Sequence, residues 1–144
     1  CIYPLVVLFG EPERVQSSAT MLESGVDGQG TVMLTYNDME AMIYHSKISN
    51  SDLPSEIQGE EGTIVIDSIS TPENIKIVYR EGSVEQIFAQ SVDHSMYYET
   101  EEFIKLIENN EQESQVNSYK HSRVTAQIIE TARKQIGLLY PADV

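Results

Sequence analysis

The sequence predicts an α+β fold with an open, mainly antiparallel β-sheet and helices packed on one face. Three observations support this fold class. Between residues 14 and 90, apolar and polar residues alternate in about seven short stretches, as they do in strands. Short, turn-rich connections join these stretches and favour antiparallel pairing, because parallel strands need crossover helices. After Ser91 the spacing becomes helical, and strands followed by helices are typical of the α+β class.

The first half of the chain predicts a helical start and then a hairpin. Residues 2–9 have the composition of a helix end or buried segment, closed by Gly10 and Pro12. A long strand follows from Arg14, and residues 25–30 are so rich in turn formers that they predict a loop. Residues 31–36 and 39–47, joined by Asn37 and Asp38, predict a β-hairpin.

The second half predicts two more strand pairs and two helices. The pairs are 54–59 with 62–67, and 75–80 with 84–90. Thr100 is the expected cap of the first helix, whose apolar stripe is Phe103, Ile104 and Ile107. The last helix is expected to begin near Ser118 and end at Gly137, and it buries residues at four-residue steps: Val124, Ile128, Ala132 and Ile136.

The composition excludes several partners. Nine Lys and Arg against 23 Asp and Glu give a formal charge of -14, which disfavours nucleic acid and anionic membranes as partners.

The length fits a single domain over residues 1–144. The lone cysteine, Cys1, excludes an intrachain disulfide and suits a cytoplasmic protein. Because an apolar run follows Cys1 at once, we expect a piece of a longer protein rather than a lipoprotein with a polar tether.

The predicted hairpin is apolar on both faces. Met33, Met42 and Tyr44 alternate with the residues that would face the helices. Helices can cover only one face of a sheet, and monomers avoid large exposed apolar patches. We therefore expect these three residues at the interface of a homo-oligomer.

No catalytic constellation stands out. The three histidines, His45, His94 and His121, lie far apart, so no metal site is predicted. Gly25, Gly28 and Gly30 lack the spacing of a phosphate-binding loop. His94 and Tyr97 lie where strands give way to helix, a position that can line a cleft, although solvated turn residues would have the same pattern.

Several blocks occur in an order that resembles a known family. They are residues 8–15 (LFGEPERV), 23–27 (ESGVD), 57–64 (IQGEEGTI), 96–99 (MYYE), and 132–137 (ARKQIG) with a following Pro141. In this order they resemble the C-terminal domain of the Gfo/Idh/MocA oxidoreductases. Within that family the chain looks most similar to the dihydrodiol dehydrogenase and glucose–fructose oxidoreductase branch.

The resemblance implies a two-domain NAD(P)-dependent dehydrogenase for a sugar, polyol or dihydrodiol-type alcohol. The missing Rossmann domain would bind NAD or NADP and carry the catalytic Lys. The proton-transferring Tyr or His would fall just before Cys1, about one turn ahead of Tyr3. The chain alone would then contain no catalytic residue, bind no cofactor and be inactive. Tyr3, His94 and Tyr97 are the candidates for its part of the substrate cleft.

Two other readings remain open at this point. The chain could be a stand-alone, non-enzymatic dimerisation or scaffold module, which a start codon or lipoprotein signal directly before Cys1 would favour. It could also be an independent enzyme using Tyr3, His94 and nearby carboxylates, although nothing in the sequence places these groups within hydrogen-bond reach.

Overall fold

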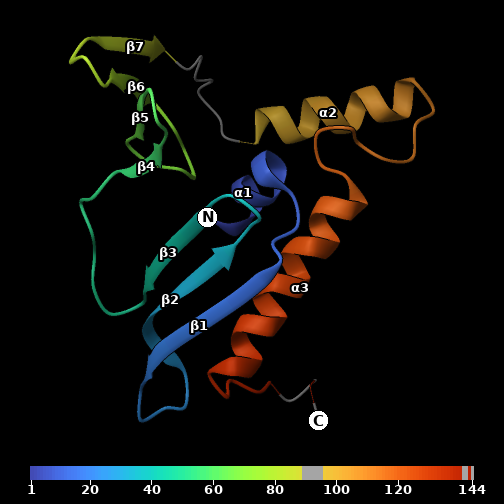
Figure 1. Cartoon of the computed structure of the whole chain (residues 1–144). Coiled ribbons are helices and arrows are strands. Elements are labelled where there is room, and N and C mark those ends of the chain that lie inside the picture. Colours follow the sequence, from blue (N-terminus) through green and yellow to red (C-terminus); the bar gives the residue numbers. More distant parts are fainter. Residues whose placement is uncertain (89–95, 141–142, 144) are drawn as a thin grey trace. The chain divides into compact units, whose positions relative to one another are not determined.

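The computed structural model describes residues 1–88, 96–140 and 143, shown in Figure 1. The chain forms two compact units. Unit 1 contains Cys1–Asn50 and Glu113–Val144, and unit 2 contains Ser51–Gln112. We describe each unit by itself.

Unit 1 is built on a three-stranded antiparallel sheet in the order β1-β2-β3. The strands are β1 (Arg14–Met21), β2 (Asp27–Thr35) and β3 (Glu40–Ser46). The predicted hairpin is confirmed, because Tyr36 N–H donates to the Met39 carbonyl across the short turn. The register places Val32 opposite Ile43 and Met33 opposite Met42, so each cross-strand pair shares one face.

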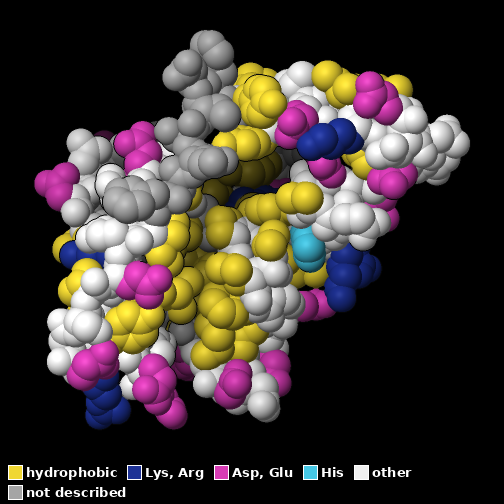
Figure 2. Space-filling model, turned by 90° about the horizontal axis from the view of Figure 1, so that it is seen from above, with side chains coloured by type: hydrophobic (Ala, Val, Ile, Leu, Met, Phe, Trp, Pro, Cys, Tyr) yellow, Lys and Arg dark blue, Asp and Glu magenta, His cyan; other side chains and the backbone are white. Residues whose placement is uncertain are grey.

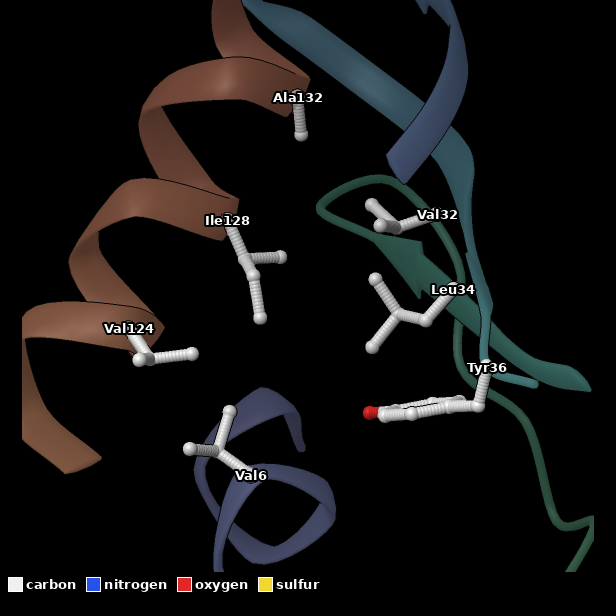
Figure 3. Packing of buried hydrophobic residues seen from close by; sticks show 7 residues of the cluster. All are labelled: Val6, Val32, Leu34, Tyr36, Val124, Ile128 and Ala132. Atoms are coloured by element: carbon white, nitrogen blue, oxygen red, sulfur yellow. The ribbon is translucent and has the colours of Figure 1, made fainter. Parts of the chain in front are cut away.

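Two helices cover one face of this sheet: α1 (Ile2–Phe9) and α3 (Tyr119–Gln135). Figure 3 shows Ile128 of α3 and Leu34 of β2 pointing toward each other, with Val6 of α1 beside them. Leu34 is 0% exposed and belongs to the buried hydrophobic cluster of this unit. As predicted, α3 begins near Ser118, and the Ser118 side chain caps it by accepting a hydrogen bond from His121 N–H.

Unit 2 is a four-stranded antiparallel meander with one helix. Its strands are β4 (Ser55–Gln58), β5 (Gly62–Ile66), β6 (Asn74–Tyr79) and β7 (Val84–Phe88), and its helix is α2 (Tyr97–Glu108). Ile57, Ile64 and Ile77 face each other across three strands and give the sheet an aliphatic face. None of the described residues of α2 is buried.

The α+β class and the antiparallel pairing are confirmed, but three details differ from expectation. The seven described strands form two sheets of three and four strands, rather than one. Residues 27–30, expected in a loop, belong to β2, where a Cβ on Gly30 would collide with the Ser18 carbonyl oxygen of β1. Helix α2 begins at Tyr97, so Thr100 lies within its first turn and donates to the Met96 carbonyl instead of capping.

Candidate functional site

The face of sheet β1-β2-β3 opposite the helices carries the three predicted interface residues. Met42 is 58% exposed and Tyr44 is 75% exposed, while Met33 is half-buried between its neighbours. Polar residues border this apolar centre: Gln16 pairs with Met33, and the Ser18 and Thr31 hydroxyls lie 2.9 Å apart. An apolar centre with a polar rim is the anatomy of a protein–protein interface.

Tyr3 projects from α1 toward the segment that precedes α3. Its hydroxyl donates to Asn117 Oδ1 at 2.8 Å and approaches the Val116 carbonyl at 3.3 Å. Its ring meets His121 edge-on, with centroids 6.3 Å apart. Burial raises the pKa of the Tyr3 phenol. These contacts tie α1 to the start of α3, and a place at the rim of a substrate cleft remains a prediction.

Tyr97 begins α2 in unit 2 and is 49% exposed. Its hydroxyl donates to Glu101 Oε1 at 3.1 Å, and this carboxylate raises the pKa of the phenol. Its ring meets Tyr98 edge-on at 5.6 Å. His94 lies outside the described residues. Tyr3 and Tyr97 belong to different units, so their convergence in one cleft stays a prediction.

A buried carboxylate that no sequence pattern predicted lies at the end of the β1-β2-β3 sheet where β2 begins and β3 ends. Asp27 is 6% exposed, and its Oδ1 accepts from Lys47 Nζ at 2.5 Å, while His45 Nδ1 lies 3.6 Å from Oδ2. The hydrogen bond from Lys47 holds the pKa of Asp27 below its usual range. This cluster ties the start of β2 to the end of β3. The local sequence does not predict this cluster, because Asp27 and Gly28 stand in a stretch rich in turn residues.

Two hollows lie within the units. One of about 390 Å³ in unit 1 is lined by α3 and the approach to β1, including Arg14, Glu130 and Lys134. The other, of about 340 Å³, lies at the β4–β5 turn of unit 2. Tyr3 and Tyr97 line neither hollow.

The described residues contain neither a cluster of metal ligands nor a pair of parallel strands. Among them, no group of His, Cys, Asp and Glu side chains could hold a metal ion. Figure 2 shows Asp and Glu side chains spread across the visible surface. The described strands pair antiparallel throughout, so this part of the chain contains no βαβ unit of the kind that binds a dinucleotide. No described helix is long and apolar enough to span a membrane.

Comparison with known proteins gives clear relatives, although no family model matches the chain. The chain is 54% identical to "scyllo-inositol 2-dehydrogenase (NADP(+)) IolU" of Bacillus subtilis, over 99% of this chain and 44% of that protein. It is 30% identical to a trans-1,2-dihydrobenzene-1,2-diol dehydrogenase of Danio rerio, over 99% of this chain and 46% of that protein. The chain thus spans somewhat less than half the length of these relatives.

The fold is also found among solved structures. The UDP-N-acetylglucosamine 3-dehydrogenase GnnA of Acidithiobacillus ferrooxidans matches with a TM-score of 0.76 and 17% identity, over 96% of this chain and 46% of that one. At this identity the match shows the fold alone. The sequence relatives, which match over nearly the whole chain, are oxidoreductases of the Gfo/Idh/MocA type, the family that the ordered sequence blocks resemble.

Proposed function

We propose that residues 1–144 form the C-terminal substrate and oligomerisation domain of an NADP-dependent dehydrogenase. The observation that carries this proposal is the 54% identity to a scyllo-inositol 2-dehydrogenase over 99% of the chain. Because the relatives match over 99% of the chain, and so across both units, we treat the two units as one domain. The complete protein would place this domain beside a cofactor-binding part outside these residues.

The names of the relatives narrow the substrate class. scyllo-Inositol and trans-1,2-dihydrobenzene-1,2-diol are both six-carbon rings with hydroxyl groups on adjacent carbons. We infer that the substrate is a cyclic alcohol of this kind. The overall reaction converts the alcohol and NADP⁺ into the ketone, NADPH and a proton. We favour NADP over NAD because the B. subtilis relative is named for NADP(+).

The proposed roles of this chain and of the rest of the protein follow from the described residues. They contain no dinucleotide-binding unit, so the cofactor and the proton-transferring Lys and Tyr or His would belong to the rest of the protein. This chain would contribute one wall of the substrate cleft, with Tyr3, His94 and Tyr97 as its candidates. By itself it would neither bind NADP nor turn over an alcohol.

The activity is tested with the full-length protein in an assay of NADPH formation. scyllo-Inositol with NADP⁺ should be turned over with a higher kcat/KM than an acyclic polyol of the same carbon number, because the acyclic chain must be ordered on binding. Equal turnover of both alcohols would contradict the ring preference. The absence of activity with any of these alcohols, despite NADP binding, would remove the proposed reaction.

The apolar face of the first sheet would form the subunit contact. The Met42→Glu substitution places a carboxylate at the centre of that face, where burial without a partner is costly. We expect light scattering to show a smaller assembly than the parent. Leu53→Glu is the control, because Leu53 is 84% exposed in the connection between β3 and β4. A parent protein that is monomeric throughout, or an unchanged Met42→Glu assembly, would rule out this face.

A further inference from the structure

The side chain of Gln135, at the end of α3, lies along the outer edge of β1. Its Nε2 donates to the Val15 carbonyl at 2.8 Å, and its Oε1 accepts from Ser17 N–H at 2.8 Å. Both groups of β1 lie on the edge away from β2, its pairing partner in the three-stranded sheet. One side-chain amide thus occupies a donor and an acceptor of an edge strand.

These two bonds have the pattern of a neighbouring strand. In a parallel ladder, the N–H and C=O of one residue bind the carbonyl and the amide on either side of the opposite residue. Gln135 does the same around Gln16, with its side-chain amide in place of a peptide group. A second contact fixes the helix end to the strand, because Ser17 Oγ donates to the Ala132 carbonyl at 2.8 Å.

Strand β1 needs such a cover because its own sequence offers little protection. Exposed edge strands recruit other chains unless charges, prolines or covering elements block them. After its first residue, Arg14, the strand (residues 15–21, VQSSATM) contains neither a charged residue nor a proline. The protection that other edges gain from Lys or Pro must here come from outside the strand.

We propose that Gln135 closes the β1 edge against strand addition by a second copy of this chain. The amide acts as a one-residue substitute for a parallel strand, and its removal leaves the edge of residues 15–21 free to pair. This inference concerns unit 1 alone and does not rest on the proposed dehydrogenase activity. It confines self-association of the native protein to surfaces other than the β1 edge.

The test compares Gln135→Ala and Gln135→Glu with the parent in the full-length protein. Gln135→Ala removes both bonds, so Ser17 N–H should exchange with solvent roughly tenfold faster, equivalent to a hydrogen bond of about 1.4 kcal/mol. Mass spectrometry on the peptide containing β1 measures this rate. Sedimentation at rising protein concentration should show larger species for this variant alone. Gln127→Ala, the same change on the exposed surface of α3, is the matched control.

Gln135→Glu separates an open edge from a merely weakened protein. Its carboxylate can still accept from Ser17 N–H, and its charge guards the edge, although the donor to Val15 is lost. We expect no larger species and a protected Ser17 amide. Equal association of the Ala and Glu variants, or an unchanged size distribution for Gln135→Ala, would overturn the proposal. If Gln135→Ala does not fold, rapid exchange of the Ser17 amide in Gln135→Glu would overturn the proposal instead.

Discussion

Replacing Tyr3 by Phe tests whether this residue supports the fold or takes part in the chemistry. The substitution removes the hydroxyl and keeps the edge-on ring contact with His121. The hydroxyl has one proton, which goes mainly to Asn117 Oδ1 at 2.8 Å. That oxygen also accepts from Ser122 Oγ at 3.3 Å, so it is not left unpaired in the variant. The loss should therefore lie near the usual net value of one hydrogen bond, about 0.5–1.5 kcal/mol.

Urea unfolding and steady-state kinetics of the full-length protein measure the two effects separately. The unfolding midpoint of Tyr3→Phe should fall with an unchanged dependence on urea. Its kcat for scyllo-inositol should stay within about a factor of two, less than 0.5 kcal/mol of barrier, whether or not KM changes. Tyr140→Phe is the control, because the Tyr140 ring, rather than its hydroxyl, contacts Arg133. A loss of kcat of about 10²–10⁴ with unchanged stability, the effect of removing a general acid or base, would refute the structural assignment.

Two further substitutions test features that the fold depends on. A Cβ on Gly62 would lie 2.6 Å from the Val78 carbonyl oxygen. Gly62→Ala should therefore lower the free energy of unfolding by about 1–3 kcal/mol. Gly59→Ala is the control and should have little effect, because the atom nearest to a Cβ there is 3.5 Å away. Asp27→Asn removes a carboxylate whose pKa is lowered by Lys47. A lowered folded-state pKa stabilises the fold above the unfolded value near 4, and this stabilisation disappears as the pH falls through the folded value. Urea unfolding at several pH values should therefore show a difference between parent and Asp27→Asn at neutral pH that shrinks in acid, and a constant difference would contradict this origin.

The hairpins were predictable because their turns carry strong local signals. Asn37 with Asp38, and Gly82, stand between stretches of alternating residues, and each joins strands that pair in the structure. The final helix was predictable for a similar reason, since Ser118 begins it and its buried residues recur at four-residue steps. Local chemistry decides these elements.

The differences arise where non-local packing decides. Gly30 has the residue type of a turn, yet it lies in strand β2. Glycine is needed there because the β1 backbone approaches so closely that it leaves no room for a Cβ. Thr100 has the chemistry of a cap, but its hydroxyl binds a carbonyl within the helix. Alternation also cannot tell which strands share hydrogen bonds, so a division into two sheets was not foreseeable.

The candidate site shows the same limit. The three interface candidates follow from strand alternation alone, and the structure exposes Met42 and Tyr44 on the face away from the helices. In the sequence, Gln135 is marked only as part of the block at residues 132–137 (ARKQIG). Its role depends on contacts with residues 118 and 120 positions away, for which no local pattern exists.

The most direct test of the account is calorimetric titration of NADPH into residues 1–144 and into the full-length protein. We expect saturable binding to the full-length protein and no binding heat with residues 1–144, since their described strands provide no dinucleotide-binding unit. NADH should also produce no heat with the shorter chain. Micromolar binding of either nucleotide to residues 1–144 would contradict the assignment of this chain as the substrate and oligomerisation domain.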